Sequence, residues 1–256
     1  MKSVLVIGIG AGDPDYVTMQ AIKALNDVDV FFVIDKGEAK DDLARLRREI
    51  CERYITAGTY RFVVVDDPVR DRSGPAYREN VEAWRQKRVG LCAKLINDEL
   101  KDGECGAFLV WGDPSLYDGT ILVLQQILAE GSAAFDYAVI PGISSVQALA
   151  ARHRVPLNRI GEAIQITTGR RLAAEGMPDG VDNVVVMLDT GDAALKAAAG
   201  KDPEIYWGAY LGTEEEILVA GKLRDRIQEI ERLRQTKRAE QGWIMDTYLL
   251  RRPHED

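Results

Sequence analysis

Histidine and cysteine are scarce in this sequence. The 256 residues include 2 histidines, His153 and His254, and 3 cysteines, Cys51, Cys92 and Cys105, which stand far apart with no C-x-x-C spacing. Ligand clusters for a metal and histidine-based nucleophile triads both need more of these residues than the chain offers. We therefore expect no metal cofactor, and we interpret the cysteines as buried or incidental thiols of a reducing compartment.

Long apolar runs and an excess of positive charge are also missing. The first apolar run, residues 4–7, is too short for a signal peptide, and no stretch reaches membrane-spanning length. The formal net charge of −8 argues against a general nucleic-acid-binding protein, which needs a basic surface. These absences predict a cytoplasmic protein without a membrane or nucleic-acid partner.

The hydrophobic pattern predicts an α/β protein with two domains of different style. In residues 1–145, short apolar runs alternate with helix-like segments, which favours a doubly wound, mostly parallel sheet. These runs are residues 4–9, 30–34, 62–65, 107–111 and 137–140. In residues 146–256, several strand-like runs follow one another without a helix, which favours a mixed or antiparallel sheet with helices. These runs are residues 162–168, 184–188, 205–211, 216–220 and 243–249. The domain boundary is expected within residues 118–150.

Helical segments are expected between these strands. Leu43, Leu46, Ile50 and Tyr54 recur at helical spacing. Residues 222–240 read as a helix that buries leucine and isoleucine beneath a charged outer face; its apolar residues are Leu223, Ile227, Ile230 and Leu233.

Three turn motifs end apolar strands: "GIGAGD" (8–13), "WGDPSLYDG" (111–119) and "PGISSVQA" (141–148). The first is similar to a dinucleotide-binding turn, but Asp13 stands where that fingerprint needs its third glycine. Gly112 and Asp113 would bend the chain sharply, and Ser144 and Ser145 would cap the next helix or donate to a ligand. Because the carboxyl ends of parallel strands share one edge of a sheet, we expect all three turns to face one crevice.

The order of these three motifs resembles the tetrapyrrole (corrin/porphyrin) methylase family, as do the later segments "NVVVMLDTG" and "GAYLGTEEEILVAGKL". The resemblance implies S-adenosylmethionine as methyl donor, a tetrapyrrole (precorrin) substrate, a homodimer, and an active site in the cleft between the two domains. Ala11 departs from the family, which usually has proline at this position of the first loop.

The family also implies which residues contact each ligand. Ala11 and Gly12 would border the tetrapyrrole trough, with Asp13 near its floor. The implied cofactor contacts are Gly112, Asp113, Leu116, Ser144, Ser145, Met187, Leu188, Tyr210 and Gly212.

Three further segments, residues 28–43, "RLRREIC" (45–51) and residues 66–85, resemble the branch of the family that makes precorrin-6A in aerobic cobalamin biosynthesis. Such an enzyme methylates carbon 1 of precorrin-5 and releases the acetyl group there as acetate. Forked guanidinium groups match the carboxylate arms of such a substrate; the predicted substrate-binding arginines are Arg70, Arg72, Arg78, Arg170 and Arg171. Acetyl loss needs a base to deprotonate the attacking water, and Asp35 is the first candidate, with Tyr117 and Asp13 as alternatives.

Other readings stay open at this point. The acceptor could be a different precorrin position, a protein or an RNA. A nucleotide-dependent oxidoreductase would use Asp29 or Asp35 as a ribose ligand, although Asp13 in place of glycine argues against it. A non-catalytic tetrapyrrole carrier would have no use for the cofactor loops.

Overall fold

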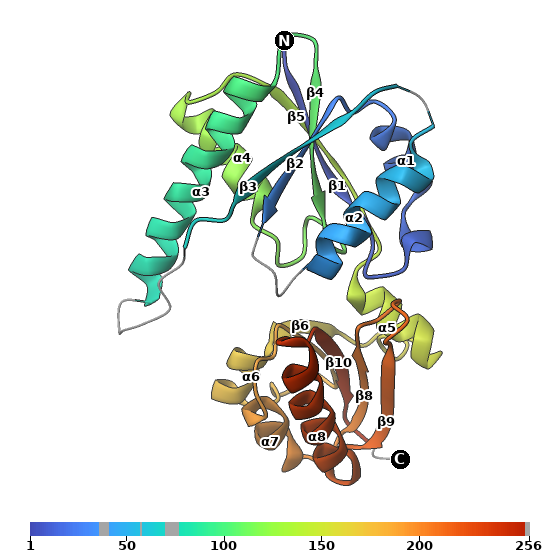
Figure 1. Ribbon diagram of the computed structural model, residues 1–256. Coiled ribbons are helices and arrows are strands. Elements are labelled where there is room, and N and C mark those ends of the chain that lie inside the picture. The colour runs from blue at the N-terminus through green and yellow to red at the C-terminus, as the bar shows by residue number, and fades with distance from the viewer. Residues whose placement is uncertain (36–40, 57, 70–76, 254–256) are drawn as a thin grey trace. The chain divides into compact units, whose positions relative to one another are not determined.

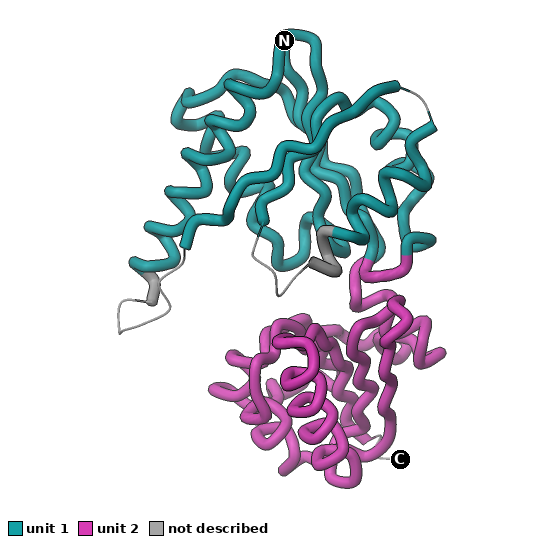
Figure 2. The backbone as a smooth tube through the Cα atoms, viewed as in Figure 1, with its two compact units in different colours: residues 1–10, 14–143 teal, residues 11–13, 144–256 magenta. Residues whose placement is uncertain are grey.

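The computed structural model describes residues 1–35, 41–56, 58–69 and 77–253, without the side chains of residues 41–44, 77 and 78. The chain divides into two compact units (Figure 2). Unit 1 comprises Met1–Gly10 and Pro14–Ile143, and unit 2 comprises Ala11–Asp13 and Ser144–Asp256. Three residues of the first loop therefore pack with the second half of the chain.

Unit 1 contains a five-stranded sheet in which every pairing is parallel, as the near-continuous apolar runs predicted. Its order is β3-β2-β4-β1-β5. The strands are β1 (Ser3–Gly8), β2 (Val30–Asp35), β3 (Arg61–Asp66), β4 (Cys105–Val110) and β5 (Asp136–Ile140). The register pairs Gly8 with Val110 and Ile7 with Ile140, so the carboxyl ends of these strands meet at one edge.

Helices cover both faces of this sheet (Figure 1). They are the short 3-10 turn η1 (Pro14–Tyr16) and the α-helices α1 (Met19–Leu25), α2 (Asp41–Tyr54), α3 (Tyr77–Glu99) and α4 (Thr120–Glu130). Because successive strand side chains point to opposite faces, Phe31 packs into the core under α1 and α2 while Phe32 packs into the core under α3 and α4. The parallel, doubly wound architecture is confirmed.

Unit 2 contains a five-stranded mixed sheet of order β6-β7-β10-β8-β9. The pair β6 and β7 is parallel and the other pairs are antiparallel, which confirms the predicted change of style. Its elements are α5 (Ser145–His153), β6 (Ile164–Thr168), α6 (Gly169–Glu175), β7 (Asn183–Met187), α7 (Ala193–Ala199), β8 (Glu204–Ala209), β9 (Ile217–Lys222), α8 (Leu223–Gln241) and β10 (Asp246–Arg251). Every residue of the central strand β10 is buried.

None of the helices in the described ranges is both long enough and apolar enough to span a bilayer.

Candidate functional site

The three glycine motifs meet through their backbones in unit 1. A Cβ atom on Gly142 would lie 2.1 Å from the Gly112 carbonyl oxygen, and one on Gly8 would lie 2.7 Å from the Gly142 nitrogen. Real Cβ atoms do not approach backbone so closely, so only glycine fits at this junction. The Gly112 N–H also donates to the Gly10 carbonyl at 2.8 Å. The ends of β1, β4 and β5 are thereby held together without side chains between them.

Asp113 connects the second motif to the third. Its carboxylate accepts hydrogen bonds from the Gly142 N–H (2.9 Å), the Ser115 N–H (2.8 Å) and the Ser115 hydroxyl. Burial raises the pKa of the Asp113 carboxyl, but the hydrogen bonds from Ser115 and Gly142 outweigh this effect, and the pKa lies below its ordinary value. The ionised carboxylate therefore organises the two loops.

Strained backbone marks three of the predicted site residues. Tyr117, Leu188 and Tyr210 have φ angles of 55°, 52° and 49°, in the left-handed region that disfavours side chains. Two of these side chains are open to solvent, Tyr117 at 45% and Leu188 at 60% exposure. Such conformations persist only where the surrounding structure fixes them, and they gather at ligand-binding sites.

Two serines begin helix α5 in unit 2. The Ser144 hydroxyl accepts from the Val146 N–H at 3.1 Å, and the Gln147 side chain accepts from the Ser144 N–H at 3.2 Å, which together form a capping box. Ser144 is therefore a helix cap. The Ser145 hydroxyl accepts from the Thr247 hydroxyl at 3.0 Å, which links the start of α5 to strand β10.

A fully buried arginine supports the other two predicted cofactor loops of unit 2. Arg234 of α8 donates from Nε to Asp246 Oδ2 at 2.8 Å and from Nη2 to Asp189 Oδ2 at 3.0 Å. Burial lowers the pKa of Arg234, but the charges of Asp246 and Asp189 outweigh it and raise the pKa, so the guanidinium is held charged. Asp189 comes directly after Leu188, and the carbonyl of Met245, next to Asp246, accepts from the Tyr210 N–H at 3.0 Å.

Two buried aromatic side chains complete this network. The Trp207 indole donates to Asp246 Oδ2 at 2.6 Å, and the Tyr248 hydroxyl donates to Asp189 Oδ2 at 2.8 Å. The buried acceptors therefore have partners, which a buried carboxylate requires. These hydrogen bonds and ion pairs fix the positions of the turns at Leu188 and Tyr210.

The first loop packs against the turn after β8. A Cβ on Gly12 would lie 2.1 Å from the Leu211 carbonyl oxygen, and Gly12 has a φ of 123°. Ala11 is almost fully buried. Gly12, which was predicted to border the substrate, thus approaches Leu211, the residue between the predicted cofactor residues Tyr210 and Gly212, all within unit 2.

The predicted arginines and bases that the structure describes come from several elements of the two units. Arg170 and Arg171 lie in the first turn of α6, where Arg171 pairs with Glu175 at 2.9 Å. Arg70 and Arg72 fall outside the described residues, and Arg78 lies in α3 without a described side chain. Asp35 and Tyr117 belong to unit 1, whereas Asp13 belongs to unit 2.

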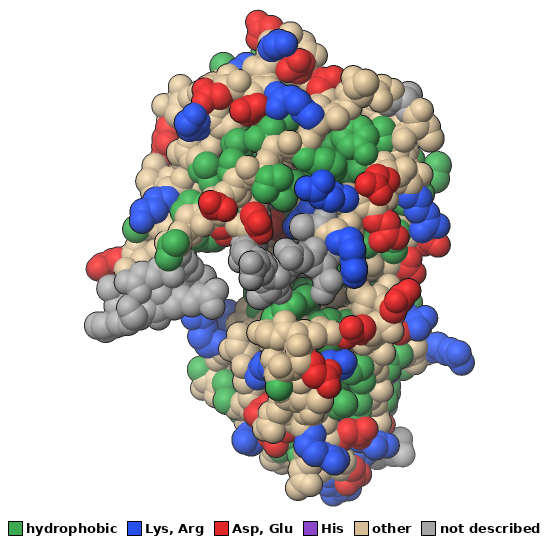
Figure 3. Space-filling view, viewed as in Figure 1, with side chains coloured by type: hydrophobic (Ala, Val, Ile, Leu, Met, Phe, Trp, Pro, Cys, Tyr) green, Lys and Arg blue, Asp and Glu red, His purple; other side chains and the backbone are tan. Residues whose placement is uncertain are grey.

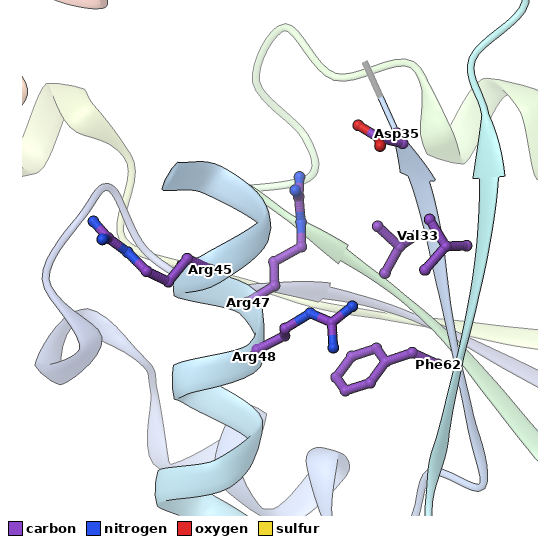
Figure 4. A pocket seen from close by; sticks show the side chains of 7 residues that line it. Val33, Asp35, Arg45, Arg47, Arg48 and Phe62 are labelled. Atoms are coloured by element: carbon purple, nitrogen blue, oxygen red, sulfur yellow. The ribbon is translucent and has the colours of Figure 1, made fainter. Parts of the chain in front are cut away.

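Sequence reasoning missed a cavity of about 340 Å³ in unit 1. The described residues that line it are Val33, Asp35, Arg45, Arg47, Arg48, Phe62 and Val64 (Figure 4). Only the apolar residues of α2 had been used to predict the helix. The signal that was available is the run "RLRR" (45–48), which follows soon after Asp35 at the end of β2.

No cluster of three or more histidine, cysteine, aspartate or glutamate side chains that could hold a metal ion occurs in the part of the chain that the structure describes.

Comparisons with known proteins agree on one family. The model of the tetrapyrrole (corrin/porphyrin) methylases matches residues 3–226. Precorrin-6A synthase [deacetylating] of Sinorhizobium sp. is 48% identical over 252 residues, which covers 98% of this chain and 96% of that protein.

Solved structures of cobalamin biosynthesis proteins are also similar to this chain. A cobalamin synthesis related protein (CobF) from Corynebacterium diphtheriae superposes with a TM-score of 0.83 at 39% identity, covering 98% of this chain and 99% of that one. A cobalt precorrin-4 methyltransferase, CbiF, superposes with a TM-score of 0.62 at 16% identity and covers 97% and 94% of the two chains, a likeness of fold.

Proposed function

We propose a function from one premise: the chain belongs to the tetrapyrrole (corrin/porphyrin) methylase family. Its function is that of an S-adenosylmethionine-dependent methyltransferase in aerobic cobalamin biosynthesis, which methylates carbon 1 of precorrin-5 and releases the acetyl group as acetate. The observation that carries this proposal is the 48% identity, over nearly the full length of both chains, to a precorrin-6A synthase [deacetylating].

The residues present fit the methyl donor. The close backbone junction of Gly8, Gly112 and Gly142 leaves amides and carbonyls in place of side chains, and the left-handed turn at Leu188 leaves an apolar side chain open for contact. In unit 1 the cofactor contacts are Gly112, Asp113 and Leu116. In unit 2 they are Ser144, Ser145, Met187, Leu188, Tyr210 and Gly212. S-adenosylmethionine, when bound, supplies an electrophilic methyl group on a sulfonium.

The chain's own groups then have two tasks. The fixed loops align donor and acceptor for an in-line displacement, which supplies much of the rate enhancement. For acetyl loss, Asp35 takes the proton of the water that adds to the ketone carbonyl, with Tyr117 and Asp13 as the alternative bases. The bond between the acetyl carbon and carbon 1 then breaks, the acetyl group leaves as acetate, and the conjugated macrocycle takes up the electron pair of that bond. Asp35 is supported by its place at the carboxyl end of β2, the edge at which open α/β sheets bind ligands.

A single assay tests the proposed reaction. The purified protein is incubated with methyl-labelled S-adenosylmethionine and precorrin-5, and the products are analysed by mass spectrometry. We expect one labelled methyl per product and acetate in equal amount. Methyl transfer to another precorrin without acetate release would show that the enzyme methylates a different precorrin position, which is the alternative within the family. No transfer to any precorrin would refute the proposed function.

Three finer points stay part of this proposal: the enzyme works as a homodimer, in the cytoplasm, and without a metal cofactor. They rest on the family resemblance and on the composition of the chain.

A further inference from the structure

The cavity of unit 1 combines positive charge with an apolar floor. Of the residues that line it, three are arginines and one is an aspartate, so the lining is net positive although the protein carries a net charge of −8. The arginines come from α2, and the other residues come from β2 and β3. Guanidinium groups are the side chains best matched to carboxylates.

Two of these guanidinium groups have contacts that orient them. Arg47 donates from Nε to the Leu109 carbonyl at 3.2 Å. Burial lowers the pKa of Arg47, while the charges of Asp118 and Asp35 act in the opposite direction. The Arg48 guanidinium lies over the Phe62 ring, 5.2 Å from its centroid (Figure 4). A guanidinium that is already positioned loses little freedom when an anion binds.

The apolar side of the cavity consists of Val33, Phe62 and Val64. Val64 is 50% exposed, and hydrophobic atoms gather over β3 on the face shown in Figure 3, beside charged side chains. Apolar surface next to arginines fits a ligand that carries a carboxylate on a short alkyl stem.

The cavity also lies at the functional edge of the sheet. Asp35 is the last residue of β2, and Leu109, which accepts from Arg47, is the penultimate residue of β4. Ligands of open parallel sheets bind at this carboxyl edge. The cavity therefore adjoins the residue proposed above as the base.

We propose that this cavity receives an acetate or propionate arm of the tetrapyrrole substrate, with Arg47 and Arg48 binding the carboxylate and Val33, Phe62 and Val64 packing against its methylene groups. This inference rests on the proposed function. It assigns substrate recognition to arginines that the motifs did not indicate, and it brings the macrocycle next to Asp35.

The test compares Arg48→Gln with Arg53→Gln. Both arginines lie on α2, but Arg53 is absent from the cavity lining and pairs with Asp15. We expect Arg48→Gln to raise the KM for precorrin-5 about tenfold, as the loss of a charge-assisted contact does, with the affinity for S-adenosylmethionine unchanged. Arg53→Gln keeps the wild-type KM. Arg47→Lys, which keeps the charge but loses the fork, gives a second and independent rise in KM.

The outcomes separate this inference from the proposed function. If the wild type does not methylate precorrin-5, the proposed function fails. If the wild type is active and Arg48→Gln and Arg47→Lys both keep its KM, the cavity does not bind the substrate. Released acetate is the other carboxylate of the reaction. If the variants change inhibition by added acetate and leave KM unchanged, the cavity holds the free acid and the assignment to a substrate arm is wrong.

Discussion

Leu188 is unfavourable for folding, and in the proposed cofactor site it is useful for binding. Its left-handed backbone costs roughly 1–2 kcal/mol, and its side chain is 60% exposed, so the fold gains little from it. A leucine that a cofactor buries stabilises the complex by about 1.5 kcal/mol or more, close to a tenfold change in affinity.

We therefore expect Leu188→Gly and Leu188→Ala each to weaken S-adenosylmethionine binding about tenfold. Leu188→Gly keeps the free energy of unfolding within about 1 kcal/mol of the wild type, because relief of strain offsets the greater freedom of glycine in the unfolded chain. Binding is measured by calorimetry and unfolding by urea. Unchanged affinity in both variants would show that the Leu188 side chain does not touch the cofactor.

Asp113 gives a pH-dependent prediction. Its pKa is lowered in the folded state, so it stabilises the fold above its unfolded pKa of about 3.9, and this stability is lost as the pH falls through the lower folded value. We expect Asp113→Asn to reduce the free energy of unfolding by about 1–3 kcal/mol at pH 7, because asparagine cannot accept all the hydrogen bonds of the carboxylate.

The difference between wild type and Asp113→Asn should shrink as the pH falls below about 4 and through the lower folded pKa of Asp113, because the wild-type side chain is neutral below that value. Urea unfolding at several pH values measures it. Asp102→Asn, at an exposed carboxylate, is the control and should change little. A difference that stays constant with pH would show that the charge of Asp113 is not what holds the loops.

At the scale of elements, Gly12 joins the first loop to the turn after β8. Gly12→Ala introduces both an unfavourable φ and a clash with the Leu211 carbonyl oxygen. Gly103→Ala is a matched control, because Gly103 has a φ of 90° and nothing within 4 Å of the added Cβ. We expect Gly103→Ala to cost about 1 kcal/mol of unfolding free energy and Gly12→Ala at least about 2 kcal/mol, measured by urea unfolding. Equal costs would mean that the contact with Leu211 is adaptable.

The strands of unit 1 were predictable because short runs of apolar, β-branched and aromatic residues form a local pattern in the sequence. Residues 30–34 and 137–140 were expected as strands, and the structure has Val30–Asp35 and Asp136–Ile140. The last strand was expected at 243–249 but forms at Asp246–Arg251. The reason is tertiary: the carbonyls of Trp243 and Met245 accept hydrogen bonds from Tyr210, which holds this segment outside the strand.

The buried network around Arg234 was not predicted, although one signal existed. The helix was read as apolar residues beneath a charged face, which places every arginine outside. Yet Arg234 follows Ile230 by four residues and therefore shares its buried face. Its partners Asp189 and Asp246 are 45 and 12 residues away. Pairings of this kind depend on the fold and cannot be read from local periodicity. The contact of Gly12 with Leu211 could not be predicted either, because it also joins residues that are far apart in the sequence.

At the scale of the whole molecule, each unit has its own hydrophobic core. The clusters around Phe31 and Phe32 lie within unit 1, and the cluster around Trp207 lies within unit 2. The three cysteines all belong to unit 1, where burial raises the pKa of Cys51 and of Cys92 to about 12. Labelling of Cys51 and Cys92 therefore reports the opening of unit 1, because neutral buried thiols react slowly.

Arg234→Met separates the two units experimentally. It leaves Asp189 and Asp246 buried without their cation, which costs about 3–5 kcal/mol in unit 2. In a background with Trp84→Phe and Trp111→Phe, tryptophan fluorescence reports unit 2 through Trp207 and Trp243. We expect the urea midpoint of fluorescence to fall and the midpoint of thiol exposure to stay near that of the same background. Arg232→Met, at an exposed position of the same helix, should move neither. An equal fall of both midpoints would show that the two cores unfold as one cooperative unit, since damage confined to the second would then open the first.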